Sequence, residues 1–267
     1  MRLAPAVAYP NDNKANKWSA VCCLLNYRAQ RMNYEELARQ ELHAWQYKMQ
    51  KDPGLLDKLS KRTQDKLNSF IPEKAHQAIT LTIQKMVQAV LFGAKYTTML
   101  PQPEAPLQWK ESRLQDRILF YRNTAVAEGA VTGAGGILLG LADFPLLLTI
   151  KIKFLFDAAA IYGFDVKDYR ERLYILYIFQ LTFSSKRKRK ETFALLQNWA
   201  AYSSNLPADP EQFNWREFQQ EYRDYIDLAK MAQLLPVVGA LVGAAANYKL
   251  MNQLGEAAMN AYRMRIF

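Results

Sequence analysis

The sequence predicts an all-α protein, a compact bundle of several helices, and three observations support this prediction. Apolar residues recur at helical spacing through most of the 267 residues. No alternating strand pattern runs for more than a few residues, and no internal repeat has a fixed period. Half of the residues are hydrophobic, so a chain of this length can bury a substantial core.

The N-terminal part is expected to be a loose tail, residues 1–17, followed by a helical region, residues 18–100. A first helix is predicted to begin at Asn33, because Asn33 and Glu36 have the spacing of a capping box. Its inward residues would be Leu37, Leu42, Trp45 and Met49.

Two further helices are predicted before residue 100. One runs over about 55–70, after the turn formed by Asp52, Pro53 and Gly54. The next begins at Pro72, a residue tolerated in a first helical turn. It would carry inward Ile79, Ile83, Met86, Val87 and Val90.

Residues 101–106, PQPEAP, form a proline-rich linker, because three prolines in six positions cannot lie inside a helix. Residues 107–267 would form a helical core, which either stands apart from 18–100 or packs with it as one domain. Gly163 is expected to end one core helix and Asp165 to cap the next. Pro236 should kink or break the last helical region. The predicted core helices cover about 106–128, 144–162, 166–183, 191–202 and 214–267.

Two glycine-rich stretches are predicted to be apolar helices that pack against each other. The first contains glycines at intervals of 4, 3 and 4 residues, which share one helix face: Gly129, Gly133, Gly136 and Gly140. The second has Gly239 and Gly243, four apart. Such faces allow two backbones to approach closely.

Other interpretations of the glycines are weaker. No lysine or arginine lies between Arg122 and Lys151, so a phosphate-binding loop is not supported. Leu138 stands where a dinucleotide-binding fingerprint needs its third glycine. Two alternatives to a buried helix pair remain open, namely shallow insertion into a membrane and a full span over 129–150.

The net charge of +10 indicates an anionic partner or simply a soluble surface. Five consecutive cations follow the apolar segment LYILYIFQLTF, and they are Lys186, Arg187, Lys188, Arg189 and Lys190. A basic cluster at the end of an apolar helix is typical of contact with an anionic membrane surface. Lys151 and Lys153 would add to it if they share that face. A solvated loop is the alternative, and no motif for binding nucleic acid is present.

Residues suited to catalysis or metal binding are sparse. Cys22 and Cys23 are adjacent and leave no disulfide framework, which fits a reducing compartment. His43 and His76 form no zinc motif with them, so no metal or cofactor is expected.

Carboxylates are the better candidates, namely Glu128, Asp143, Asp157, Asp165, Asp168 and Glu171. Asp143 with Pro145 is expected to mark a helix start, where a carboxylate suits the exposed N–H groups. Glu171 lies between Arg170 and Arg172, and an ion pair with one of them is expected.

Three segments resemble the EcsC family, bacterial proteins named from an operon that also encodes an ABC transporter. They are residues 67–98 (LNSFIPEKAHQAIT and onward), 132–176 (TGAGGILLGLADFPLLL and onward) and 235–265 (LPVVGALVGAAANY and onward). The resemblance implies a helical protein of the cytoplasmic side, linked by gene neighbourhood to an ABC transporter. It attaches no activity, cofactor or catalytic residue.

Three functions are therefore open. The first is a non-enzymatic accessory protein, peripheral at the cytoplasmic face of the membrane, whose partners are ABC transporter subunits and anionic lipid. The second is a binder of lipid or another hydrophobic ligand. The third is a hydrolase that uses carboxylates near Asp143. The sequence gives no oligomeric state.

Overall fold

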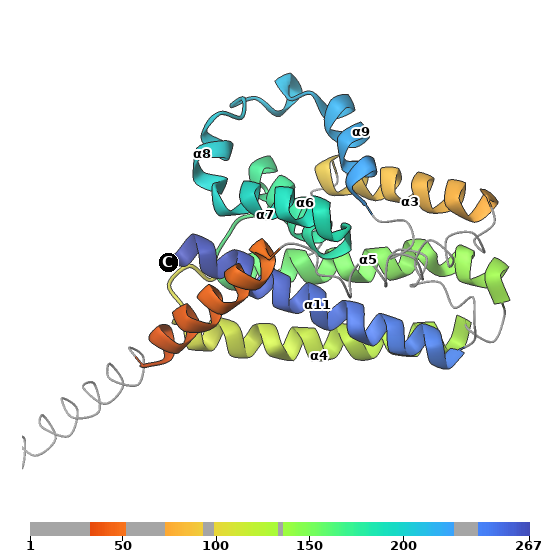
Figure 1. Ribbon diagram of the computed structural model, residues 1–267, viewed down its shortest axis with the longest axis horizontal. Helices are drawn as coiled ribbons and strands as arrows, with labels where there is room; N and C mark the ends of the chain where they lie inside the picture. Colours follow the sequence, from red (N-terminus) through yellow and green to blue (C-terminus); the bar gives the residue numbers. More distant parts are fainter. Residues whose placement is uncertain (1–32, 52–72, 93–98, 133–135, 227–239) are drawn as a thin grey trace, which may run out of the picture.

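The computed structural model describes residues 33–51, 73–92, 99–132, 136–226 and 240–267. These residues are almost entirely helical, which confirms the predicted all-α class. Figure 1 shows a packed bundle of helices. The elements are a helix over 33–50, α3 (Glu73–Phe92), α4 (Leu107–Thr132), α5 (Gly136–Tyr162), α6 (Tyr169–Phe183), α7 (Lys186–Gln197), α8 (Trp199–Ser204), the 3-10 turn η2 (Pro210–Gln212), α9 (Trp215–Tyr225) and α11 (Ala240–Ile266).

Three long helices, α4, α5 and α11, form the lower layer of the molecule in Figure 1. Residues 101–106 are non-helical, as their prolines require, and α4 begins directly after them. Gly163 follows α5 with φ +96°, in the left-handed conformation predicted for a helix-ending glycine. A Cβ atom there would lie 2.5 Å from the Cα of Pro103, so the linker also needs glycine at this position.

Helix α6 is central to the core, and nearly all of its residues are buried. Its N-cap is Asp168, whose side chain accepts a hydrogen bond from the backbone N–H of Arg170. The predicted cap, Asp165, instead accepts from the N–H of Lys167 in the preceding turn. The apolar segment of α6 therefore packs inside the protein.

The predicted inward residues of α3 are confirmed, whereas its predicted first residue, Pro72, lies outside the described residues. Helix α3 begins at Glu73, directly after Pro72, and its five predicted inward side chains are all buried. In the helix over 33–50, Leu42 and Trp45 are buried, but Leu37 is exposed. Residue 33 is already helical, so Asn33 does not cap this helix. The predicted helix over 55–70 lies outside the described residues.

One hydrophobic cluster runs through the described residues. Ala38 and Trp45 of the first helix and Ile83 of α3 share it with Leu173 of α6 and Leu254 of α11. The N-terminal helices thus pack on the same core as the rest. Within the described part of the chain, no helix combines the length and apolar character needed to span a membrane.

Candidate functional site

The basic run forms the start of helix α7. The sequence prediction placed the helix from about residue 191 and the cations before it, but the helix begins at Lys186. Phe193 and Leu196 are buried on its inner face and anchor it to the core. Among the cations of this run whose side chains the structure describes, Lys190 is exposed. The Nζ atom of Lys188 lies 3.5 Å from Glu191 Oε2.

Local helix chemistry does not favour cations at this position. The first turn of α7 contains no acidic residue, and Ser185 at the N-cap makes no side-chain capping hydrogen bond. The N-terminal end of a helix carries a partial positive charge, which the lysines and arginines reinforce instead of neutralising. The start of α7 is therefore a concentrated positive region.

Lys151 does not contribute to this region, although the sequence left that open. It is fully buried between α5 and α11, where its Nζ donates to Asn247 Oδ1 at 3.0 Å and to the Leu147 carbonyl at 3.4 Å. Burial lowers its pKa to about 7. Lys153 points to Asp157, with Nζ 3.7 Å from Oδ1.

The structure divides the first set of glycines between two helices, and the predicted pairing of two glycine-faced helices stays a prediction. Gly129 lies in α4, whereas Gly136 and Gly140 lie in α5, so the four predicted glycines do not share one helix face. Gly133 and Gly239 lie outside the described residues, and Gly243 lies in α11.

A close contact between helices does exist, but at Gly255 of α11. A Cβ atom on Gly255 would come within 2.6 Å of Ile118 Cδ1 on α4. No second glycine lies four residues away, so the spacing signal used for the other glycines could not find it.

Asp143 and Pro145 also differ from the prediction. They do not mark a helix start, because α5 begins at Gly136 and contains Pro145 in its interior. The buried residues Phe144, Leu147 and Leu148 hold this part of α5 in the core despite the proline. Asp143 is partly exposed.

The other carboxylates have structural partners. Glu171 is buried and accepts from Arg265 of α11 at 2.5 Å, not from the neighbouring arginines as expected. Burial raises the pKa of Glu171, against the lowering effect of Arg265. Asp157 accepts from Tyr121 at 2.8 Å and faces Arg117 at 3.7 Å. Among the described residues, no group of three potential ligands could hold a metal ion.

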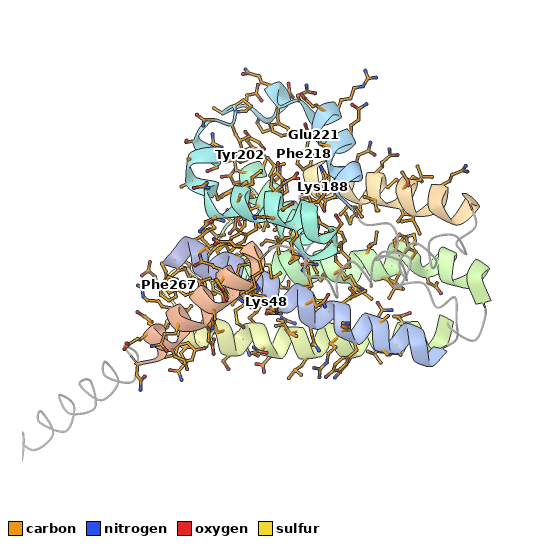
Figure 2. All side chains as sticks on the ribbon, in the orientation of Figure 1. Lys48, Lys188, Tyr202, Phe218, Glu221 and Phe267 are labelled. Carbon is orange, nitrogen blue, oxygen red and sulfur yellow. The ribbon has the colours of Figure 1, made fainter. Side chains whose placement is uncertain are left out.

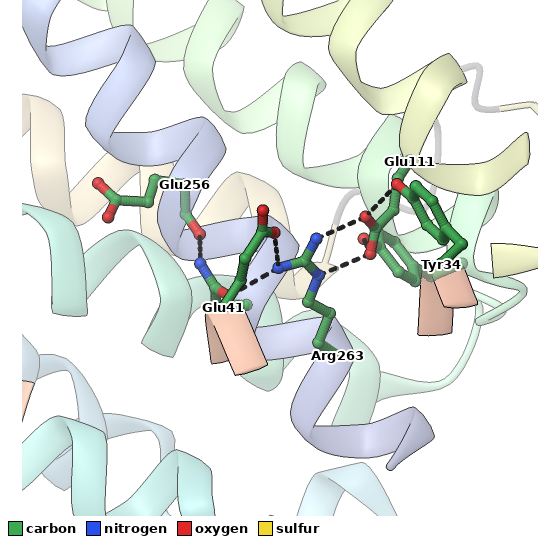
Figure 3. Close-up of polar contacts among 7 residues, drawn as sticks. Tyr34, Glu41, Glu111, Glu256 and Arg263 are labelled. Carbon is green, nitrogen blue, oxygen red and sulfur yellow. Dashed lines mark hydrogen bonds and ion pairs between the residues drawn. The ribbon is translucent and has the colours of Figure 1, made fainter. Parts of the chain in front are cut away.

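The strongest polar network centres on Arg263, which sequence reasoning missed (Figure 3). Its Nε and Nη2 each donate to Glu111 of α4 at 2.6 Å, and its Nη1 donates to Glu41 at 2.9 Å. Tyr34 donates to Glu111 at 2.7 Å, and burial raises the pKa of this tyrosine. The network joins the first helix, α4 and α11, and its charges are paired with one another.

A groove of about 540 Å³ lies beside this network, between the first helix, α4 and α11. Its lining mixes apolar side chains, such as Trp45 and Met259, with amides and charges. An ion pair between Lys48 and Glu256 at 3.1 Å links its two sides. The groove is open to solvent and has charged side chains on both sides, unlike the enclosed site in which most of a hydrophobic ligand is buried.

A smaller cavity of about 90 Å³ lies between α6, α7 and α9. Three aromatic residues, Tyr177, Phe218 and Tyr222, line it together with Gln180 and the carboxylates Glu191 and Glu221. Glu191 directly follows the basic run. Figure 2 shows Lys188, Phe218 and Glu221 on the same side of the molecule. Asp143 lines neither this cavity nor the groove.

Comparisons with known proteins place the chain in a family. Residues 36–267 match the model of the EcsC protein family. Protein EcsC of Bacillus subtilis (strain 168) is 45% identical over 236 residues, which cover 88% of this chain and 97% of that protein. Uncharacterized protein YdbA of the same strain is 28% identical over 253 residues, covering 86% and 93%. No solved structure is significantly similar. The long family match and the high identity to Protein EcsC show that this chain belongs to the EcsC protein family.

Proposed function

We propose that this protein is a non-enzymatic accessory protein, which binds the cytoplasmic face of the membrane through the basic run of α7 and acts with an ABC transporter. The observation that carries the proposal is the concentration of five cations in the first turns of one helix. Neither capping nor helix-dipole chemistry accounts for them. Cations at a helix start run against this local preference, and such departures are typical of a functional surface.

The size of the expected effect follows from the charge. Each lysine or arginine near an anionic bilayer contributes about 1 kcal/mol. Because Lys188 also faces Glu191, we expect about 4 kcal/mol from the run, or roughly a thousandfold in partitioning. This attraction must weaken as salt rises, since the Debye length falls from about 10 Å at 0.1 M to about 3 Å at 1 M.

Liposome flotation tests the surface. The protein is mixed with phosphatidylcholine vesicles, with or without phosphatidylglycerol, at low and high salt. We expect it to float only with the anionic vesicles and to be released by salt. A variant with residues 186–190 changed to glutamine should stay at the bottom.

A matched control removes five exposed cations elsewhere, and so lowers the net charge equally. It carries glutamine at Lys51, Lys85, Lys167, Arg216 and Lys249. We expect this control to float nearly as well as the wild type. If both variants lose flotation equally, total charge matters and the position of the run does not. If the 186–190 variant still floats, the run is not the membrane contact.

The transporter part of the proposal is supported by family membership and needs its own test. We expect transporter subunits to co-purify with the protein at native expression levels from gently solubilised membranes. Repeated absence of those subunits, in preparations where the protein itself is retained, would contradict it.

A further inference from the structure

The small cavity between α6, α7 and α9 has an aromatic wall with fixed orientation. The ring of Phe218 lies 5.7 Å from that of Tyr177, at 86°, and 5.6 Å from that of Tyr222, at 39°. The Tyr177 hydroxyl is hydrogen-bonded to the Tyr202 hydroxyl at 2.9 Å, and Tyr222 donates to the Leu176 carbonyl at 3.0 Å. Both hydroxyls thus bind groups outside the cavity lining, and the rings supply its wall.

One residue that lines the same cavity, Gln180, carries an unused hydrogen-bond acceptor. Gln180 is 3% exposed, and its Oε1 has no hydrogen-bond partner among the described residues. A buried acceptor without a donor destabilises the folded protein, so such a group calls for an explanation. A ligand that brings an N–H donor into the cavity provides one.

The charges around the cavity select the sign of that ligand. Glu191 of α7 and Glu221 of α9 line it, and Glu221 is close enough to Tyr177 and Tyr202 to raise the pKa of both, after burial itself. Glu191 already faces Lys188, which offsets part of its charge, so Glu221 supplies the larger attraction for a cation. An anion would meet two carboxylates and the negative faces of aromatic rings, whereas a cation is attracted by both.

We propose that this cavity binds a primary alkylammonium group, as found in ethanolamine. The rings and carboxylates attract its charge, and its N–H groups satisfy Gln180 Oε1. A quaternary ammonium has no N–H to donate, so it should bind less well despite the aromatic wall. A volume of about 90 Å³ corresponds to roughly three water molecules, which suits a small polar head and not a lipid chain.

Calorimetric titration of the full chain with ethanolamine is the first experiment. For a molecule of four heavy atoms we expect a dissociation constant on the order of 0.1–1 mM. Tetramethylammonium, which lacks N–H donors, and 1-propanol, which has the same size but no charge, should bind at least tenfold more weakly. Equal binding of the three, or no binding of ethanolamine, would overturn the proposal.

Two variants test the named groups. Gln180→Leu removes the acceptor while keeping the volume, and should weaken ethanolamine binding about tenfold or more, since a hydrogen bond to a charged group is lost. Glu221→Gln is an exposed change that does not threaten folding, and should weaken it about two- to fivefold. Glu211→Gln, an exposed change of equal charge on η2, should leave binding unchanged. Unaltered affinity in both cavity variants would contradict the assignment.

Two sources share this chemistry, a free amine and the headgroup of phosphatidylethanolamine. The headgroup would place its phosphate near the cations that precede Glu191 on α7, so the lipid source rests on the proposed membrane function, whereas binding of free ethanolamine does not. Vesicles containing phosphatidylglycerol are compared with and without phosphatidylethanolamine. A gain in flotation that Gln180→Leu abolishes identifies the lipid. Binding of free ethanolamine without such a gain identifies a soluble amine.

Discussion

Replacing Lys151 by methionine should stabilise the protein, and the gain should depend on pH. Lys151 is fully buried, hydrogen-bonded to Asn247 and lies among apolar residues of α5 and α11. Its pKa falls from an ordinary 10.5 to about 7, and burial is the only cause of that shift. Methionine fills a similar volume without a charge.

The sign of the effect follows from proton binding. Below pH 7 the lysine is protonated in both states, so the folded protein bears the full cost of a buried charge. Between pH 7 and 10.5 only the unfolded chain keeps the proton, and stability rises with pH. At 1.36 kcal/mol per pKa unit, the cost is on the order of 5 kcal/mol at pH 6 and vanishes above pH 10.5.

The methionine variant also loses the hydrogen bond to Asn247, which costs about 1–3 kcal/mol at every pH. We therefore expect Lys151→Met to be more stable than the wild type by about 2–4 kcal/mol at pH 6. Its advantage should shrink through pH 8 and disappear near pH 9 to 10.

Urea unfolding of both proteins at several pH values measures this difference. Lys153→Met is the control, because Lys153 is partly exposed on the same helix and pairs with Asp157. The free energy of unfolding of this control should differ from that of the wild type by a nearly constant amount between pH 6 and pH 9. A constant difference for Lys151→Met over the same range would refute the reasoning, since it would mean that Lys151 keeps its proton in the folded state.

Two more predictions concern the packing of α11. Arg263→Met should destabilise the protein by about 3–5 kcal/mol, because it leaves Glu111 buried without its partner, and adding Glu111→Leu should recover most of the loss in the same urea assay. Full additivity of the two changes would contradict this. Gly255→Ala should cost about 1–2 kcal/mol, since its Cβ would meet Ile118. The cost should fall in an Ile118→Val background, which lacks Cδ1, and an unchanged cost would place the strain elsewhere.

Local periodicity predicted the helices best where one face alone is buried. In α3 the apolar residues from Ile79 to Val90 repeat at helical spacing, and all of the predicted ones are buried. The prediction is less successful for 129–150, which is apolar except for Asp143 and two threonines and offers no single face to count from. The glycine spacing predicts one helix there, whereas α4 ends at Thr132 and α5 begins at Gly136.

Capping residues and helix breakers predict the wrong helix starts where tertiary packing outweighs local preference. Pro145 favours a helix start, yet it lies inside α5 because buried neighbours on both sides hold the helix together. The cations of 186–190 oppose a helix start, yet α7 begins with them because Phe193 and Leu196 anchor it. Local preferences of about 1–3 kcal/mol, the larger value for an interior proline, are outweighed by several buried side chains that each contribute about 1.5–3 kcal/mol.

The buried polar pairs could not be predicted, and their common feature is α11. Glu111 of α4 finds Arg263 across 152 residues, and Lys151 of α5 finds Asn247 across 96. Glu171 of α6 is paired with Arg265. No local pattern encodes separations of this size.

The three pairs fix how α11 lies against its neighbours. Each ties α11 to a different helix, α4, α5 or α6, at a different height along its axis. A slip of α11 by one turn would separate Glu111 and Glu171 from their arginines and Lys151 from Asn247 at the same time, which leaves these buried charges without their main partners. The C-terminal helix therefore sets the register of the bundle through these polar contacts with three neighbouring helices.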